Sequence, residues 1–287
     1  MKIFDAVKEA IKVLARSGSA TPKLDAEVLL SLVLKKDRAR LHIDHNQELS
    51  EEDIREFMRC VERRSSGEPV AYIVGEKEFW SLPFFVNRHV LIPRPETEIL
   101  VEETLRICSG IKGLDLKILE IGTGSGAISI ALAHELPGAK ITATDMSQDA
   151  LDVAIKNARI NNVETQISFL QGDLYKPVSG RVDIIVSNPP YIPKEEYDSL
   201  PRGVRDFEPE AALLAGDDGT AFHRAIIEGS GNHLKPGGWL LMEIGAGQKD
   251  RVEFMLNQSN LYDSIAFKAD YAGMVRVSIA RRAMIGG

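Results

Sequence analysis

The tetrapeptide Asn188-Pro189-Pro190-Tyr191 carries the clearest chemistry in the sequence, and it directly follows the apolar run at 182–187. The two prolines fix the backbone and lack N–H donors, so carbonyl oxygens and the Asn188 side chain face outward. The Asn188 side-chain oxygen and the Pro189 carbonyl can each accept one N–H of a planar NH2 group, against which Tyr191 can pack its ring. Because an amide or aromatic-amine nitrogen is a poor nucleophile, its modification depends on positioning and fixed dipoles. An ordinary proline turn explains these residues less well than a clamp for an NH2 group.

A glycine-rich loop between a predicted strand and a predicted helix forms a second candidate site. It reads Gly122-Thr123-Gly124-Ser125-Gly126. Glycines allow a sharp turn and a close approach of the backbone to a ligand. The loop lacks the lysine of a phosphate-binding Walker loop and has G-x-G-x-G in place of the dinucleotide pattern G-x-G-x-x-G. Glu120, at the end of the strand, is unfavourable beside a pyrophosphate but suits the sulfonium and ammonium groups of S-adenosylmethionine.

Two further acidic residues follow the next two predicted strands. Asp145 stands about twenty residues beyond the loop, where a carboxylate can accept hydrogen bonds from both hydroxyls of a ribose. Asp173 lies at the same rim, where open α/β sheets bind ligands. Each residue alone is explained equally well as the cap of a turn. Together with Glu120, however, they favour a nucleoside site around the glycine loop.

The elements before residue 96 are expected to be helical first and then β-rich. Residues 1–75 predict a helical domain, with Phe4, Val7, Ile11 and Leu14 at helical spacing in its first helix. Later helices start at Thr21-Pro22 and Ser50, where capping residues precede apolar stripes. From Val70 the sequence is rich in β-formers, including Tyr72, Ile73 and Val74, so we expect a β-hairpin-like connector, with its domain bounds at 76–95.

Strands and helices alternate through the remaining domain, 96–287, which is typical of a mostly parallel sheet covered on both faces. We expect strands at 116–121, 140–144, 166–170, 182–187 and 238–244, with helices at 96–107, 126–135, 148–160 and 220–233. The strands 264–268 and 275–280 are too close in sequence for a parallel crossover and predict an antiparallel hairpin. The predicted fold is α/β: a doubly wound, mostly parallel sheet of the S-adenosylmethionine methyltransferase type with an antiparallel C-terminal hairpin, plus a small N-terminal helical bundle.

Composition limits the function classes. The net charge of −7 and the pI of about 5.5 argue against a tight nonspecific nucleic-acid binder, which usually needs a basic excess. Apolar runs are too short to span a bilayer, and no signal peptide is recognisable. Cys60 and Cys108 lack metal-type spacing, so we expect no metal and a reduced, cytoplasmic protein.

The glycine loop, Asp145 and the Asn188 tetrapeptide, in this order, resemble the amino-methyltransferases, which act on adenine in DNA, on RNA or on protein glutamine. Flanking segments are similar to the signature of the peptide-chain release factor glutamine-N5-methyltransferases: Phe79-Trp80, Phe85-Val86, Leu91-Ile92-Pro93-Arg94-Pro95-Glu96-Thr97-Glu98, Val204-Arg205-Asp206-Phe207-Glu208-Pro209 and Ala212-Leu213. Related ribosomal-protein methyltransferases usually have Arg-Ser-Pro where this chain has Arg94-Pro95-Glu96. The resemblance covers essentially the whole chain.

The resemblance implies methyl transfer from S-adenosylmethionine to the side-chain nitrogen (N5) of the glutamine in the Gly-Gly-Gln loop of class I release factors, hence a role in translation termination. It implies that the cofactor contacts Gly122 to Gly126, Asp145, Asp173, Leu174 and Asn188, and that the glutamine contacts Asn188 to Tyr191. Some relatives have an aromatic residue near the adenine at the position of Leu174. We expect 1–75 to recognise the substrate, with Arg94 and Glu98 beside the cleft, and we expect no stable nucleic-acid or membrane partner.

Two alternatives fit the sequence less well. A DNA adenine methyltransferase needs base flipping, a recognition domain and a basic groove, whereas this acidic chain has no large extra domain after Tyr191. A non-enzymatic nucleotide-binding module would explain the glycine loop but leaves the Asn188 tetrapeptide without a role.

Overall fold

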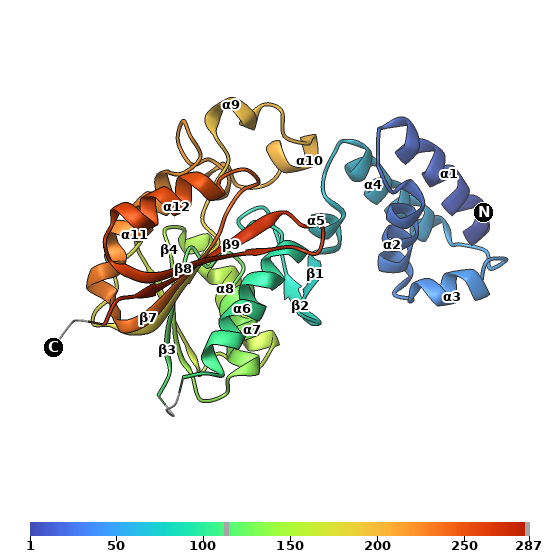
Figure 1. The fold of residues 1–287 in the computed structure, drawn as a ribbon. Helices are drawn as coiled ribbons and strands as arrows, with labels where there is room; N and C mark the ends of the chain where they lie inside the picture. Colours follow the sequence, from blue (N-terminus) through green and yellow to red (C-terminus); the bar gives the residue numbers. More distant parts are fainter. Residues whose placement is uncertain (112–114, 285–287) are drawn as a thin grey trace. The chain divides into compact units, whose positions relative to one another are not determined.

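The computed structural model describes residues 1–111 and 115–284, and its chain forms two compact units (Figure 1). The helical unit comprises Met1–Glu76 and Pro201–Phe207, and the catalytic unit comprises Lys77–Leu200 and Glu208–Gly287. The connector expected at 76–95 is thus no separate unit: Glu76 belongs to the helical unit and 77–95 to the larger unit. The last three residues of the expected domain 96–287 lie outside the described residues.

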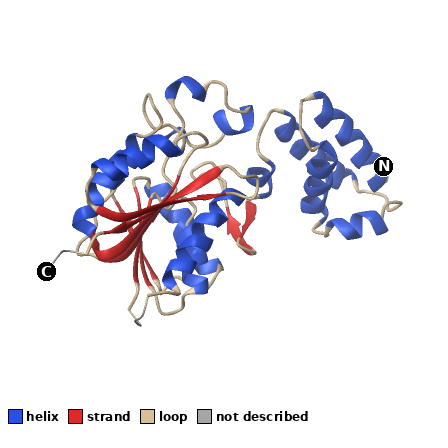
Figure 2. Ribbon diagram, in the orientation of Figure 1, coloured by secondary structure: helices blue, strands red, loops and turns tan. Residues whose placement is uncertain are grey.

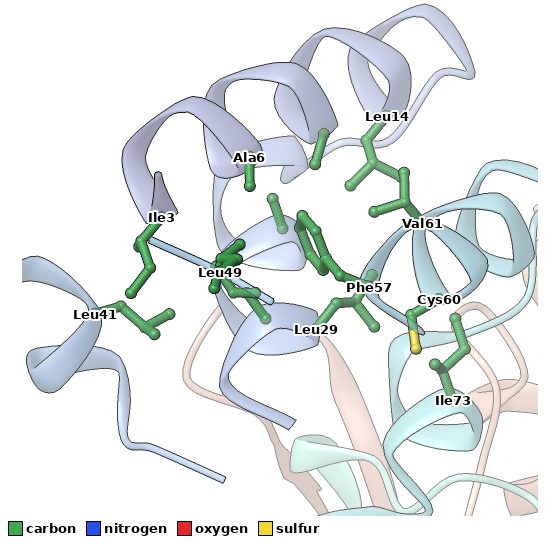
Figure 3. Packing of buried hydrophobic residues seen from close by; sticks show 13 residues of the cluster. Ile3, Ala6, Leu14, Leu29, Leu41, Leu49, Phe57, Cys60, Val61 and Ile73 are labelled. Atoms are coloured by element: carbon green, nitrogen blue, oxygen red, sulfur yellow. The ribbon is translucent and has the colours of Figure 1, made fainter. Parts of the chain in front are cut away.

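The helical unit is built around one apolar cluster, shown in Figure 3. Its helices are α1 (Ile3–Arg16), α2 (Pro22–Leu34), α3 (Arg38–Ile43), α4 (Glu51–Ser65), α5 (Val70–Val74) and α10 (Arg202–Arg205). The predicted apolar face of α1 is confirmed at Leu14, which is fully buried, and in part at Val7 and Ile11, which pack against the cluster. It is wrong at Phe4, which is 57% exposed, and it omits the buried residues Ile3, Ala6 and Ala10. Small alanines let α1 approach α2 closely, and the spacing of larger side chains alone does not reveal such a face.

The predicted helix starts in this unit have different local causes. Ser50 and Asp53 form a reciprocal capping box, in which the Ser50 hydroxyl accepts from the Asp53 N–H at 3.1 Å. Thr21 precedes the first-turn proline Pro22 as expected, but its hydroxyl donates to the Asp25 carboxylate at 2.9 Å and caps no backbone N–H.

The β-rich segment begins later than its composition predicts. Val70–Val74 is the helix α5, bounded by Pro69 and by Gly75, whose φ of +79° suits a helix end. The expectation of β-structure for Tyr72, Ile73 and Val74 is therefore wrong. Ile73 is buried in the helical cluster, and such packing outweighs a weak β-propensity. The strands β1 (Glu76–Phe79) and β2 (Leu82–Phe85) follow and form a two-stranded sheet.

The catalytic unit contains a seven-stranded sheet with the order β5-β4-β3-β6-β7-β9-β8 (Figure 2). Its strands are β3 (Lys117–Ile121), β4 (Lys140–Asp145), β5 (Ile167–Gln171), β6 (Val182–Ser187), β7 (Leu234–Glu243), β8 (Tyr262–Ala269) and β9 (Val275–Arg282). The pairs among β3 to β7 are parallel, whereas β9 is antiparallel to both β7 and β8. The predicted fold class, including the antiparallel C-terminal hairpin, is confirmed.

Helices cover both faces of this sheet, with α11 and α12 on one face and α6, α7 and α8 on the other (Figure 1). Their bounds are α6 (Glu98–Cys108), α7 (Ala127–Glu135), α8 (Gln148–Ile160), α11 (Ala221–His233) and α12 (Lys249–Gln258). The short elements α9 (Lys194–Tyr197) and η2 (Glu210–Ala212), as well as α12, have no counterpart in the sequence prediction. The short element η1 (Pro95–Thr97) forms the start of the helix expected at 96–107. No helix within the described ranges is long and apolar enough to cross a bilayer.

The register of the parallel strands brings their carboxyl ends to one edge. Ile121 lies beside Thr144 and Ser187, and Ser187 lies beside Met242. The residues that come next are therefore neighbours at this edge: Gly122, Asp145, Asn188 and Glu243.

Candidate active site

A cavity of about 350 Å³ opens at the carboxyl ends of the parallel strands. Most of the predicted site residues line it: Arg94, Glu120, Gly122, Thr123, Gly124, Ser125, Asp145, Leu174, Asn188, Pro189 and Pro190. Four others do not: Glu98, Gly126, Asp173 and Tyr191. This volume lies in the range of small-molecule sites.

The glycines of the loop have distinct structural reasons. Gly122, Gly124 and Gly126 have φ values of +74°, +53° and +83°, in the left-handed region that favours glycine. A Cβ at Gly126 would stand 2.9 Å from the Ile130 side chain, so this residue lets α7 start close to its neighbours. A Cβ at Gly122 or Gly124 would meet no atom within 4 Å, so a ligand can approach the backbone there.

Glu120 anchors the glycine loop and the start of α7 through hydrogen bonds. Its Oε2 accepts hydrogen bonds from the Thr123 hydroxyl at 2.6 Å, from the Ser129 N–H at 3.1 Å and from the Ser129 hydroxyl. The residue is only 1% exposed, and burial raises the pKa of its carboxyl to about 7 against the lowering effect of these donors. A buried carboxylate held only by neutral donors favours a cation in the adjoining cavity.

Asp145 caps a turn, which is one of the two roles considered for it, and its position on the cavity wall is compatible with the other. Its Oδ2 accepts from the Gly124 N–H at 2.8 Å and its Oδ1 from the Ser147 N–H at 2.9 Å, so it fixes the loop and caps a turn. Each carboxylate oxygen can accept more than one hydrogen bond, and Asp145 also lines the cavity. Asp173, in contrast, pairs with Lys176 at 2.8 Å and lies off the wall, to which Gly172 and Leu174 contribute.

The Asn188 side chain is oriented by residues that sequence reasoning missed. Its Nδ2 donates to the Thr97 hydroxyl at 3.1 Å, and that hydroxyl donates to Glu243 Oε2 at 2.7 Å. The Tyr191 hydroxyl donates to Glu243 Oε1 at 3.4 Å. Glu243 is an acidic residue at a strand end, the same signal that selected Glu120 and Asp145, and could have been found by it.

Burial dominates the electrostatics of this group. Glu243 is 2% exposed, and its burial raises the pKa of the carboxyl to about 7. Burial also raises the pKa of the Tyr191 hydroxyl well above its usual value, with the Glu243 carboxylate adding to the effect. Tyr191 is therefore a neutral hydrogen-bond donor at physiological pH and is no base for the reaction.

The two charged residues predicted near the cleft separate in the structure. Arg94 lines the cavity and pairs with Glu208, which also accepts from the Ile92 N–H at 3.2 Å. Glu98 lies off the cavity wall and accepts from the Trp80 N–H at 2.8 Å, in the turn between β1 and β2. Its contact is structural, and sequence spacing alone did not distinguish the two residues.

Asn157 on α8 joins the β1–β2 sheet to the glycine loop and was also missed. Its Oδ1 accepts from the Phe85 N–H at 2.7 Å, while its Nδ2 donates to the carbonyls of Phe85 and Ser125, each at 2.9 Å. Both partners precede Asn157 by more than thirty residues along the chain, so no local pattern indicates the pairing.

Comparison with known proteins adds sequence relatives over the whole chain. Residues 5–75 match the family described as PrmC N-terminal domain, and residues 97–200 match the methyltransferase small domain. Release factor glutamine methyltransferases of Moorella thermoacetica and Shewanella oneidensis are 40% and 42% identical over 283 and 280 residues. These alignments cover 98% and 97% of this chain and 99% and 96% of the relatives.

Solved structures share the fold. A methyltransferase from Pyrococcus furiosus matches with a TM-score of 0.53 at 21% identity, covering 72% of this chain and 92% of its own. A 16S rRNA methyltransferase from Thermus thermophilus, in complex with AdoMet and guanosine, matches with a TM-score of 0.50 at 16% identity, covering 72% and 49%. At such identities the likeness concerns the fold alone, whereas the near full-length sequence relatives show that the chain belongs to the family of release factor glutamine methyltransferases.

Proposed function

We propose that the protein methylates the side-chain amide nitrogen (N5) of the glutamine in the Gly-Gly-Gln loop of class I release factors, with S-adenosylmethionine as methyl donor, and so acts in translation termination. The observation that carries this proposal is the Asn188 side chain, fixed at the end of β6 on the wall of the same cavity as the glycine loop. Family membership supports the choice of a release factor as substrate.

The residues at the strand ends fit the methyl donor. Bound S-adenosylmethionine supplies an electrophilic methyl group on a sulfonium. Gly122 and Gly124 leave space beside the backbone, Asp145 can accept from ribose hydroxyls, and Leu174 offers apolar cover for the adenine. The negative charge of Glu120 favours the cationic part of the molecule. Asp173 has no part in this proposal, since its side chain pairs with Lys176 and the residue does not line the cavity.

The clamp at Asn188 supplies position and polarisation. The Asn188 side-chain oxygen and the Pro189 carbonyl each accept one N–H of the substrate amide, which holds its nitrogen in line for transfer. Pro190 keeps the backbone extended and free of competing donors. Tyr191, anchored through Glu243, supports this backbone from outside the cavity wall. The proton leaves to solvent after transfer, when the nitrogen is far more acidic.

A direct assay tests the proposal. Purified protein is incubated with labelled S-adenosylmethionine and a class I release factor, and label is expected at the Gly-Gly-Gln glutamine. Duplex DNA and ribosomal protein are offered in parallel, and a release factor with that glutamine changed to asparagine is the matched control. Label on DNA or ribosomal protein in place of release factor would refute the assignment.

The helical unit is proposed to recognise the folded release factor, because a pocket for one amide makes too few contacts to select one glutamine among many. The chain passes from the catalytic unit into this unit at Pro201 and returns at Glu208, shortly after the clamp. The protein is proposed to work in the cytoplasm, where translation takes place.

A fragment tests this role. It should start at Lys77, since a start at Arg94 removes β2 and the bonds of Phe85 to Asn157. The fragment is expected to bind S-adenosylmethionine yet lose most methylation of intact release factor. A folded, cofactor-binding fragment as active as the full chain would show that residues 1–76 of the helical unit only stabilise the protein.

A further inference from the structure

A chain of hydrogen bonds connects the clamp to a carboxylate that the proposed mechanism uses only to anchor Tyr191. Glu243, almost fully buried at the end of β7, accepts from the hydroxyls of Thr97 and Tyr191. The Thr97 hydroxyl in turn accepts from Asn188 Nδ2 at 3.1 Å. Thr97 lies just before α6 and is itself buried. The connection therefore joins the ends of two strands to the start of a helix.

The direction of these hydrogen bonds follows from the chemistry of the groups. An ionised carboxylate accepts only, so the single hydroxyl hydrogen of Thr97 is committed to Glu243. The Thr97 oxygen is then left as an acceptor, and it can pair with the NH2 side of the Asn188 amide but not with its oxygen. Reversing the amide would place two acceptors against each other and leave a buried group unpaired, at a cost of about 1–3 kcal/mol.

We infer that Thr97 and Glu243 are positioning residues that fix which end of the Asn188 amide faces the substrate. The inference rests on the proposed function, because it concerns the clamp for the glutamine NH2 group. With its nitrogen held by Thr97, Asn188 offers its oxygen as the acceptor for that group. In the reversed orientation its NH2 would face another NH2, and the substrate would be repelled or bound by its carbonyl instead. The two orientations of the Asn188 amide have the same shape, so only the positions of its oxygen and nitrogen distinguish an active clamp from an inactive one.

The charged surroundings of Glu243 come from several elements. Arg276 on β9 lowers the pKa of its carboxyl, Glu96 in η1 raises it, and the Tyr191 hydroxyl donates to it. His223 on α11 contacts the Glu243 carbonyl at 2.8 Å through Nε2, and burial lowers the pKa of this imidazole. Burial of Glu243 outweighs these effects and raises its pKa to about 7. Once protonated, the carboxyl can donate to Thr97, and the bias on Asn188 is lost.

A pair of substitutions at Thr97 tests the inference. Thr97→Val keeps the shape and removes the hydroxyl, whereas Thr97→Ser keeps the hydroxyl. We expect Thr97→Val to lower kcat for release factor about tenfold or more, which corresponds to roughly 1.4 kcal/mol, with S-adenosylmethionine affinity close to that of the wild type. The melting temperature should also fall, because Glu243 and Asn188 each lose a hydrogen-bond partner, so kcat is compared at a temperature where the variant is fully folded. Thr97→Ser should recover most of the rate. Equal kcat for Thr97→Val and wild type, or no recovery in Thr97→Ser, would overturn the inference.

Glu243→Gln gives an independent readout. Glutamine can accept from or donate to Thr97, so the orientation of Asn188 is no longer dictated and kcat should fall at about pH 8, above the carboxyl pKa. The wild type should lose activity as the pH falls through about 7, and this loss should vanish in Glu243→Gln. If the variant lost activity at low pH as the wild type does, a group other than Glu243 would cause the loss, and the inference would be contradicted. A wild type inactive on release factor would instead refute the proposed function, so the two failures are distinguishable.

Discussion

Buried carboxylates are compensated differently in the helical unit and at the carboxyl edge of the sheet. In the helical unit each accepts from an arginine: Asp25 from Arg64, Glu27 from Arg38 and Glu68 from Arg63. At the sheet edge, Glu120 and Glu243 are held by hydroxyl and backbone donors, and burial raises the pKa of both to about 7. The first kind is neutralised by an arginine within the fold, whereas the ionisation and hydrogen bonding of the second kind can respond to a neighbouring group.

The difference depends on place and not on the unit alone. Glu103, also buried in the catalytic unit, pairs with Arg106 and Lys268 and lies off the cavity wall. Glu208 pairs with Arg94, which does line the cavity. Carboxylates held by neutral donors thus occur where the site needs an uncompensated acceptor, which agrees with the clustering of perturbed pKa values at functional sites.

Replacing Asn188 is the most severe way to probe the sheet edge. Asn188→Ala removes one of the two acceptors that we propose hold the substrate amide. We expect kcat to fall about a hundredfold or more, as when one preorganised hydrogen-bonding group is removed from other active sites. Affinity for S-adenosylmethionine should change much less. Steady-state methylation and calorimetry measure the two quantities, and near-normal turnover would exclude the clamp role.

Substitution of Asp145, on the proposed cofactor side of the sheet edge, should weaken S-adenosylmethionine binding more than it slows turnover. Asp145→Ala removes the carboxylate that accepts from the Gly124 N–H and that we propose to accept from the ribose hydroxyls. The expected loss is ~1.5–3 kcal/mol of binding free energy, or tenfold to over a hundredfold in Kd. Asp145→Asn keeps one acceptor for Gly124 and should lose less. Unchanged S-adenosylmethionine binding of Asp145→Ala in calorimetry would refute the assignment.

Local sequence patterns predict the sheet edge but not the partners that hold it. Strand ends are local features, so the sequence alone places Glu120, Asp145 and Asn188 at one rim. The bond from Thr97 to Glu243 joins residues 146 positions apart and follows from the β7 register and the start of α6. Membership of 201–207 in the helical unit is likewise non-local. Such pairings depend on tertiary packing, which propensity and periodicity do not encode.

The helical unit allows the converse test, in which a buried carboxylate that is paired with an arginine loses that arginine. Arg64→Met removes the guanidinium that donates to Asp25 at 2.7 Å. Asp25 still accepts from the hydroxyls of Ser19 at 2.7 Å and Thr21 at 2.9 Å, so it comes to resemble Glu120. We expect a loss of about 1–2 kcal/mol in unfolding free energy, which is less than when removal of one partner leaves a buried charge without any hydrogen bond. Urea denaturation measures it, and a changed S-adenosylmethionine affinity would contradict the separation of the two regions.

Glu120 allows the smallest and most specific test, because its ionisation is linked to folding. The pKa of its carboxyl is raised from 4.5 to about 7 in the native protein, so its contribution to stability is fully present below the unfolded value. That contribution is lost as the pH rises through 7, where the native state must give up a proton that the unfolded state has already released. Between about pH 6 and pH 8 the unfolding free energy should fall by about 1 kcal/mol, roughly the free energy that corresponds to one pKa unit.

Glu120→Gln removes this titration, so the difference in unfolding free energy between variant and wild type should shift by that amount in favour of the variant over this range. The slope of the difference is the informative quantity, since any hydrogen bond weakened in the variant adds only a constant. Saturating S-adenosylmethionine should flatten the wild-type dependence, because a bound cation stabilises the ionised carboxylate. A wild-type slope that is equally steep with and without S-adenosylmethionine would mean that Glu120 supports the loop alone and does not act on the ligand's charge.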